Sequence, residues 1–316
     1  MTILVADVGG TNSRLAVARG GQLDVASIRR FRNADFGSFY DVIKSYQRET
    51  SIGAVSACSV ALAGPVTATS ARLTNLDWEI SVTDLKRAAN CDDALLINDM
   101  TALGYSIGHL PPQGVTSIAR PARPASQNGQ YLVAGLGTGF NVCPVKMLPT
   151  GGTTCLEAEM GHVATPISVM KILEARLNGG AADFALIEDC FSGRGLSRLH
   201  GLMSARTPID AAQIVANFCS DGDRDAELAL EVLAEVLGAL ARELVLQYMP
   251  LNGLYFAGSV VRGLFDAGFA PIFLANFARQ GRFGTQLQSV PVSLVNDDAA
   301  ALIGCVAALG QWRSPA

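Results

Sequence analysis

A pair of glycines directly after a short apolar strand is the feature that most constrains the fold. Residues 3–8 are apolar except for Asp7, and they lead through Gly9, Gly10, Thr11 and Asn12 into a second apolar run. This order predicts a strand, a tight turn and a strand. Such a turn could bind phosphate through its N–H groups and the Thr11 hydroxyl, with Asp7 holding magnesium through water. A plain hairpin beside a buried acid fits the same residues. The spacings of the P-loop and of the dinucleotide fold are absent from this stretch.

A second unit of the same kind begins near residue 131. The apolar run 131–134 leads into Gly135-Leu136-Gly137-Thr138-Gly139, and strand-like residues 142–147 follow. A hairpin rarely needs three glycines around a threonine, so a second anion-binding turn is favoured over a purely structural one. Two such units in 316 residues predict a duplicated α/β architecture with two lobes.

Strands and helices alternate along most of the chain. The expected strands are 54–62, 94–97, 254–259 and 289–295. The expected helices are 36–46, 84–89, 101–107, 168–177, 226–248 and 299–309, with one more opened by Thr207-Pro208. Asn33 or Asp35 would cap the first, and a capping box from Ser81 to Asp84 would start the second. Pro111-Pro112 indicates a crossover between the lobes. The expected division is a small α/β domain of residues 1–110 plus about 297–316 and a large α/β domain of about 111–296.

Composition excludes several classes of protein. A formal net charge of −4 does not favour binding to nucleic acid or to an anionic membrane, since both are negatively charged. A small polar substrate agrees better with this charge. The first apolar stretch is too short for a signal peptide, and acids interrupt the longest helical stretch, so no membrane partner is expected. The seven cysteines are scattered without C-x-x-C spacing, which predicts reduced thiols in the cytoplasm and gives a structural zinc site little support.

Two groups of polar residues could carry chemistry. Asp99 follows Asn98 at the carboxyl end of a predicted strand, where it could deprotonate a sugar hydroxyl, although either residue could simply cap the next helix. Glu159 and His162, with Glu157 nearby, and Glu188 further along could accept hydrogen bonds from sugar hydroxyls. Surface positions or satisfied structural roles are the alternative for these residues.

Motifs across nearly the whole chain resemble those of bacterial ATP-dependent glucokinases, in the order that this family has them. The motifs are residues 7–14, Ala63-Gly64-Pro65-Val66, Thr74-Asn75 with Trp78, Ile97-Asn98-Asp99, Gly137-Thr138-Gly139, Glu159-Met160-Gly161-His162 and Glu188 with Ser192-Gly193-Arg194-Gly195-Leu196. The resemblance is to the non-ROK glucokinases of the actin/hexokinase/Hsp70 superfamily. The related ROK sugar kinases usually carry a cysteine-rich zinc motif after the equivalent of His162, and none follows here.

The resemblance implies a two-lobed actin-like ATPase (ribonuclease H-like) fold, with a mixed sheet and flanking helices in each lobe and a cleft between the lobes. It implies a homodimer that transfers phosphate from ATP, with Mg²⁺, to the 6-hydroxyl of glucose, and Asp99 as the base. Implied sugar-binding residues are Thr74, Asn75, Asn98, Asp99, Glu159, His162 and Glu188. Implied nucleotide- or phosphate-binding residues are Asp7, Gly9, Gly10, Thr11, Asn12, Gly137, Thr138, Gly139, Gly258 and Ser259, with Asp7 also holding Mg²⁺ through water.

Three positions depart from the pattern of that family. Phe140-Asn141 stands where Leu-Gly is more frequent, Met160 replaces a common glycine, and Ser259 replaces a glycine in the motif expected to meet adenosine. Alternatives therefore remain. The first is a kinase for mannose, fructose or an amino sugar such as an N-acetyl sugar. A sugar-sensing regulator would need a DNA-binding helix-turn-helix before Ile3. A chaperone or filament protein would leave the set of Glu159, His162 and Glu188 unexplained.

Overall fold

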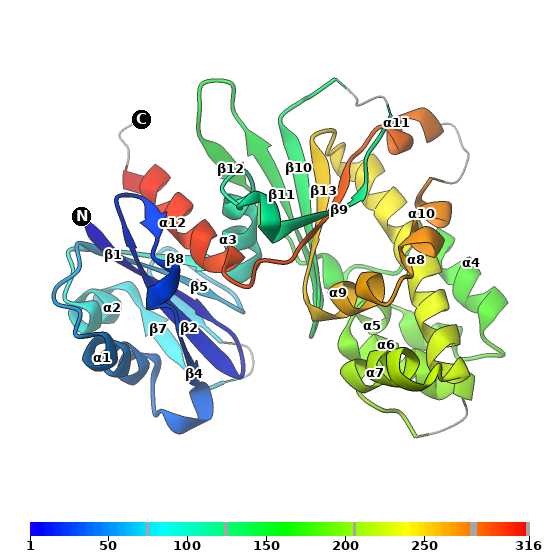
Figure 1. Ribbon diagram of the computed structural model, residues 1–316, viewed down its shortest axis with the longest axis horizontal. Helices are drawn as coiled ribbons and strands as arrows, with labels where there is room; N and C mark the ends of the chain where they lie inside the picture. The colour runs from blue at the N-terminus through cyan, green and yellow to red at the C-terminus, as the bar shows by residue number, and fades with distance from the viewer. Residues whose placement is uncertain (74–75, 123–125, 205–206, 279–282, 314–316) are drawn as a thin grey trace. The chain divides into compact units, whose positions relative to one another are not determined.

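The computed structural model describes residues 1–316 except 74–75, 123–125, 205–206, 279–282 and 314–316 (Figure 1). The chain forms two compact units. Unit 1 comprises residues 1–114, 150–157 and 297–316, and unit 2 comprises residues 115–149 and 158–296. Each unit contains a mixed β-sheet with α-helices, so the chain has the mixed α/β character expected from its sequence.

The sheet of unit 1 has the strand order β3-β2-β1-β5-β8, with β4 also paired to β2. Its strands are β1 (Thr2–Val8), β2 (Asn12–Arg19), β3 (Gln22–Leu23), β4 (Arg29–Arg32), β5 (Ala57–Leu62) and β8 (Asp93–Asn98). Strand β1 is antiparallel to β2 and parallel to β5, and β5 is parallel to β8. The unit also contains a small antiparallel pair, β6 (Ser70–Arg72) and β7 (Glu79–Ser81), and β12 (Thr153–Cys155).

Alternating side chains of β1 divide the core of unit 1 into two layers. Leu4, Ala6 and Val8 belong to the cluster that includes helices α1 (Phe39–Thr50) and α2 (Val82–Ala89). Ile3 and Val5 belong to the cluster that includes α3 (Asp99–Ser106) and α12 (Ala300–Arg313). Because side chains alternate with a period of two, Asp7 points to the same face as Ile3 and Val5. The first acid of the chain is therefore placed on the side of α3 and α12.

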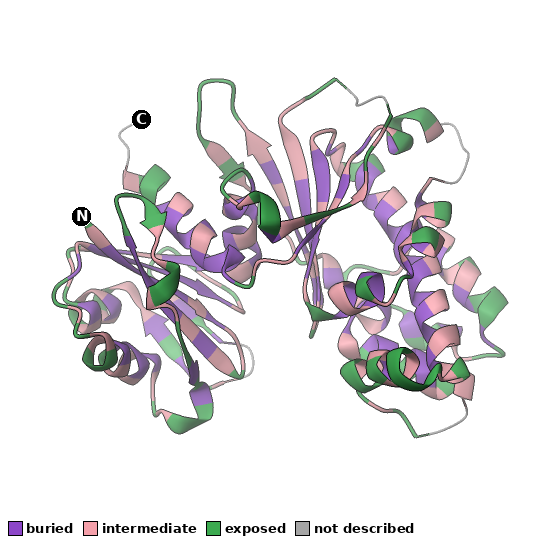
Figure 2. Cartoon of the chain, in the orientation of Figure 1, coloured by how far each residue is buried: buried purple, intermediate pink, exposed green. Residues whose placement is uncertain are grey.

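The main sheet of unit 2 contains β11, β10, β13, β14 and β9 in that order. Its strands are β9 (Val115–Ala119), β10 (Gln130–Leu136), β11 (Phe140–Met147), β13 (Gly253–Ala257) and β14 (Val292–Val295). Its helices are α4 (Ile167–Arg176), α5 (Ile187–Cys190), α6 (Gly193–Ser204), α7 (Ala211–Asp221), α8 (Arg224–Tyr248), α9 (Ser259–Asp266), α10 (Ala270–Phe277) and α11 (Gly284–Gln288). Helix α8 supplies the largest share of the apolar core of unit 2. Purple segments mark its buried residues (Figure 2).

Several expected boundaries are wrong, and each error has a local cause. Helix α1 is capped by Ser38, which accepts from the Asp41 amide, whereas Asn33 and Asp35 lie in a preceding 3₁₀ turn. No helix begins at Thr207-Pro208, because Asp210 caps α7 by accepting from the Gln213 amide.

Other expectations are confirmed or corrected by small amounts. Both strand–turn–strand hairpins form. Ser81 caps α2, but its own amide donates to the Tyr40 hydroxyl instead of completing a capping box with Asp84. Helix α3 begins at Asp99 rather than Thr101. Helices α6, α9 and α10 were not expected, because glycines and turn-like residues precede them.

Candidate active site

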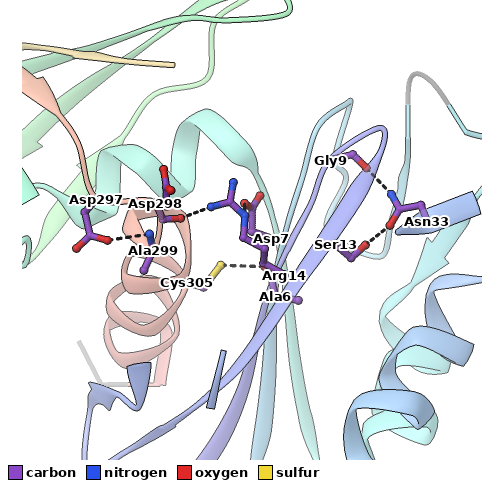
Figure 3. A network of polar contacts seen from close by, with 10 residues as sticks. All are labelled: Ala6, Asp7, Gly9, Ser13, Arg14, Asn33, Asp297, Asp298, Ala299 and Cys305. Carbon is purple, nitrogen blue, oxygen red and sulfur yellow. Dashed lines mark hydrogen bonds and ion pairs between the residues drawn. The ribbon is translucent and has the colours of Figure 1, made fainter. Parts of the chain in front are cut away.

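The turn between β1 and β2 is fixed by Asn33, a buried residue that the sequence had suggested only as a helix cap. The Asn33 side chain donates to the Gly9 carbonyl at 2.8 Å and accepts from the Ser13 hydroxyl at 2.7 Å (Figure 3). Its own amide donates to the Thr11 carbonyl at 2.9 Å, and the Gly9 amide donates to the Asn12 carbonyl at 3.0 Å. The turn is therefore held at both ends before any ligand binds.

Asp7 lies beside Arg14, which is its direct partner across the two strands. The Arg14 Nε is 3.6 Å from Asp7 Oδ2, and its Nη1 donates to the Asp298 carbonyl just before α12 (Figure 3). Burial raises the pKa of Asp7 above its usual value, and the positive charge of Arg14 opposes that shift. Behind it, burial and the charge of Asp7 raise the pKa of the Cys305 thiol to about 12, and this thiol donates to the Ala6 carbonyl at 3.5 Å.

Asn98 and Asp99 lie where β8 passes into α3. Asn98 is the helix cap: its Oδ1 accepts from the Met100 amide at 2.9 Å, and its Nδ2 donates to the Gly64 carbonyl at 3.2 Å. Asp99 is the first helical residue, and its Oδ1 also accepts from the Met100 amide at 2.9 Å. A carboxylate is electrostatically favoured at this positive end of a helix. Because Asn98 supplies the cap, a further role for Asp99 does not conflict with helix formation.

In unit 2, Asn141 on β11 organises the segment that carries Glu159 and His162. Its Nδ2 donates to the Ala158 carbonyl at 2.6 Å and lies 3.5 Å from Glu159 Oε2, while its Oδ1 accepts from the Met160 amide at 3.0 Å. Glu159 and His162 are exposed at the two ends of a single 3₁₀ turn, Met160–His162. Asn141 departs from the family pattern, and that departure was the only sequence signal for its supporting role.

Glu188 on α5 joins this segment to the second glycine turn. Its Oε2 accepts from the Phe140 amide at 3.1 Å, and its Oε1 accepts from Arg194 at 2.7 Å. A methyl group at Gly139 would collide with Glu188 Oε2, and one at Gly161 would overlap the Phe140 carbonyl. The structure therefore brings Glu188 to both the glycine turn and the 160–162 turn, and it requires glycines for that approach.

The glycine turn also borders a cavity of about 700 Å³. The turn is closed by the Gly137 amide, which donates to the Gly139 carbonyl at 3.0 Å, and the Gly193 amide donates to the Gly137 carbonyl at 2.8 Å. The lining includes Gly137, Thr138, Arg194, Arg198, Asp210 and Ser259. Gly258 has a φ of 111°, and a side chain there would overlap the backbone of Leu136, so only glycine brings β13 and α9 this close to the turn. The walls that α6 and α7 supply were not expected from the sequence.

The described residues differ in what they offer to bound groups. Thr74 and Asn75 lie outside the described residues. Among the rest, no three His, Cys, Asp or Glu side chains gather as a metal site. Asp7 and the Thr11 hydroxyl nevertheless fit magnesium that arrives with a nucleotide, because this ion keeps several waters and takes other ligands from phosphates. Across the described part of the chain, no single helix is long and apolar enough to cross a membrane, although α9 and α10 meet that test as a bent pair.

Two hairpin-containing mixed sheets and these glycine turns define an actin-like ATPase fold, which is shared with sugar kinases of known structure. The crystal structure of glucokinase from an Antarctic psychrotroph superposes with a TM-score of 0.81 at 28% identity, covering 98% of both chains. The ROK hexokinase from Thermus thermophilus has a TM-score of 0.65 at 19% identity, covering 99% of this chain and 100% of its own, which shows the fold alone.

Sequence comparison identifies the family. The glucokinase of Caulobacter vibrioides is 30% identical over 319 residues, which covers 97% of this chain and 94% of that protein. A model of the glucokinase family matches residues 4–312. The chain belongs to the glucokinase family.

Proposed function

We propose that the protein catalyses the ATP-dependent phosphorylation of glucose to glucose 6-phosphate. One observation of the structure carries this proposal: the turn 137–140 borders a cavity and is hydrogen-bonded, through the Phe140 amide, to the carboxylate of Glu188. A cavity of about 700 Å³ is within the usual range for small-molecule sites. A phosphate donor and a hydroxyl-rich acceptor would thus each have a binding group beside one turn.

Sugar binding is assigned to Asn98, Asp99, Glu159, His162 and Glu188, the residues that the family resemblance implies. Carboxylate oxygens and a neutral imidazole can accept hydrogen bonds from adjacent sugar hydroxyls. Thr74 and Asn75 remain in the proposed set from the family resemblance. We also propose that the two units serve as the small and large domains of the kinase.

Nucleotide and phosphate binding is assigned to the two glycine turns and the residues beside them. In unit 1 these residues are Asp7, Gly9, Gly10, Thr11 and Asn12, and in unit 2 they are Gly137, Thr138, Gly139, Gly258 and Ser259. When Mg²⁺ is bound with the nucleotide, it supplies positive charge to the phosphate oxygens, and Asp7 would hold it through water. Arg14 places a positive charge next to Asp7, which opposes the rise in the Asp7 pKa that burial causes.

Proton transfer is assigned to Asp99. Its carboxylate would accept the proton of the 6-hydroxyl while the N–H groups of the turns stabilise charge on the transferred phosphoryl group. The Asn98 cap fixes the backbone from which Asp99 projects. The reaction then needs positioning and charge stabilisation but no covalent intermediate on the protein.

The activity is tested by a coupled ADP-release assay with MgATP over glucose, mannose, fructose and N-acetylglucosamine. Glucose is expected to give the highest kcat/KM, and no activity on any sugar would refute the kinase assignment. Asp99→Asn is expected to lower kcat on the order of a hundredfold to ten-thousandfold. The matched control is Asp84→Asn, which changes an acid in the first turn of α2 and should leave kcat unchanged. Near wild-type turnover by Asp99→Asn would remove Asp99 as the base.

Three finer assignments accompany the proposal. We place the chain outside the ROK branch, because the next cysteine after His162 is Cys190. We assign it to the cytoplasm, where its seven free thiols would stay reduced. We assign a homodimer from the family resemblance, which light scattering coupled to gel filtration would test.

A further inference from the structure

We propose that Arg194 couples occupancy of the nucleotide cavity to the sugar affinity of Glu188. This inference rests on the proposed function, because it takes the cavity as the nucleotide site and Glu188 as a sugar ligand. Arg194 would act as a positioning residue that moves between two anionic partners. It would not touch the reacting atoms.

Arg194 already contacts both places that the coupling must connect. Its Nη2 lies 2.7 Å from Glu188 Oε1, and the residue also lines the cavity. The Arg194 side chain is 77% exposed, whereas that of Glu188 is only 24% exposed. The cation can therefore swing away at little cost, while the carboxylate is held in place by its second bond, to the Phe140 amide.

The position of Arg194 in its helix also favours a phosphate as its second partner. Arg194 is the second residue of α6, where the helix dipole is unfavourable for a cation unless an anion is close. The residue before it, Gly193, donates through its amide to the Gly137 carbonyl, so the start of α6 is fixed against the glycine turn. A phosphate at that turn would lie beside the Arg194 guanidinium, which binds phosphate in a bidentate manner.

The exchange has a defined consequence for the sugar. While Arg194 holds Oε1, and the Phe140 amide holds Oε2, both oxygens of Glu188 already accept a hydrogen bond. A carboxylate oxygen has two lone pairs, and Arg194 occupies one of those on Oε1. When a nucleotide attracts Arg194, both lone pairs of Oε1 are available to sugar hydroxyls, and Oε2 keeps its bond. Nucleotide binding should then tighten glucose binding, and glucose should tighten nucleotide binding by the same factor.

Arg198 provides a matched control within the same cavity. It lies one helical turn after Arg194 and also lines the cavity, but its Nη1 donates to the Asp183 carbonyl at 2.6 Å and its guanidinium lies over the Phe184 ring. Removing the Arg198 charge changes the electrostatics of the cavity without touching Glu188. Any effect specific to the link with Glu188 must therefore be absent from Arg198→Gln.

The test measures glucose Kd by calorimetry, with and without a saturating non-hydrolysable ATP analogue and Mg²⁺, in wild type, Arg194→Gln and Arg198→Gln. The coupling factor is the ratio of the two Kd values. It should be roughly two- to fivefold smaller in Arg194→Gln than in wild type, the range that an exposed ion pair contributes to an equilibrium. Arg198→Gln should keep the wild-type factor even if it binds the analogue more weakly. Arg194→Lys, which keeps the charge but not the bidentate fork, should fall between wild type and Arg194→Gln.

The outcomes separate this inference from the proposed function. If Arg194→Gln changes glucose Kd equally with and without the analogue, Arg194 is a static support and the inference is wrong. An equal loss of coupling in Arg198→Gln would also overturn it, because the effect would then be general electrostatics. If wild type phosphorylates glucose but shows the same coupling factor as Arg194→Gln, only the inference fails. If wild type binds no glucose at all, the proposed function fails first.

Discussion

Helices α3 and α12 approach so closely at Gly304 that a single added methyl group tests the packing behind Asp99. A Cβ atom at Gly304 would overlap the Ala102 carbonyl oxygen and would lie 2.6 Å from its carbon and 3.1 Å from Cα. All three are main-chain atoms of α3, so no side chain can rotate away. Gly304→Ala must therefore move one helix relative to the other within unit 1.

The cost of this movement can be worked out from the contacts. Overpacking a well-packed core costs typically 1–3 kcal/mol, and the rigid backbone neighbours place Gly304→Ala near the upper end, at about 3 kcal/mol. Replacing a glycine inside a helix returns about 1 kcal/mol through helix propensity. The expected net loss is about 2 kcal/mol, which corresponds to a fall in Tm of about 4–8 °C for a unit of this size. Because α3 begins at Asp99, kcat should fall as well.

Differential scanning calorimetry of Gly304→Ala beside Gly310→Ala checks this reasoning. Both substitutions lie in α12, but a Cβ at Gly310 meets no atom within 4 Å. Gly310→Ala should therefore leave Tm unchanged or raise it by the propensity gain alone. The reasoning is refuted if the two variants have the same Tm, or if Gly304→Ala raises it.

Three further predictions concern two amides that hold the candidate site, Asn33 and Asn141, and one carboxyl group with a raised pKa, Glu235. Asn33→Ala leaves the Gly9 carbonyl without its amide partner, so it should cost about 2 kcal/mol of stability and raise the KM for MgATP several-fold. An unchanged KM with normal stability would contradict the role of Asn33 as the support of the first glycine turn. Asn141→Gly removes the side-chain amide that holds the Glu159 segment, so steady-state kinetics should show a glucose KM about tenfold higher and an unchanged KM for MgATP. Equal rises in the two KM values would argue against a specific effect on the sugar side. Burial raises the pKa of Glu235, so Glu235 keeps its proton to a higher pH in the native state than in the unfolded chain. Its contribution to stability is therefore present below the usual glutamate pKa and is lost as the pH rises through the raised pKa. In urea unfolding, the Glu235→Gln variant should therefore gain stability relative to wild type as the pH rises from 4 to 8. If the stability of the variant relative to wild type falls over this pH range, the raised pKa of Glu235 is contradicted.

The strands and turns that position the candidate site could be predicted because their signals are local. Apolar runs that end in glycines gave both hairpins, and Asn98-Asp99 was placed correctly at the end of a strand. The supports of the site could not be predicted in this way. Asn33 reaches Gly9 across 24 residues, and Glu188 reaches the Phe140 amide across 48 residues. Nothing in the spacing of such pairs marks them, since they are set by how strands and helices pack.

Helix boundaries failed where two local signals competed. Pro208 is acceptable at the first position of a helix, but Asp210 offers a side-chain acceptor for the Gln213 amide, and the cap determined the start of α7. Asn33 resembled a cap for α1 because caps and turn supports use the same amide chemistry. The buried amide found its partners in the turn at Gly9 instead, while Ser38 capped the helix.

The two glycine turns are supported by different chemistry, and this difference decides how variants of the proposed site should be interpreted. In unit 1 a neutral amide, Asn33, holds the turn, and the carboxylate of Asp7 is separate from that support. In unit 2 the carboxylate of Glu188 both holds the turn, through the Phe140 amide, and serves as a proposed sugar ligand. Glu188→Gln would therefore disturb the phosphate turn and the sugar together, and a fall in its kcat would not measure sugar binding alone. Asn141→Gly alters the sugar side while leaving the bond between Glu188 and the Phe140 amide in place, so it is the cleaner probe of that side.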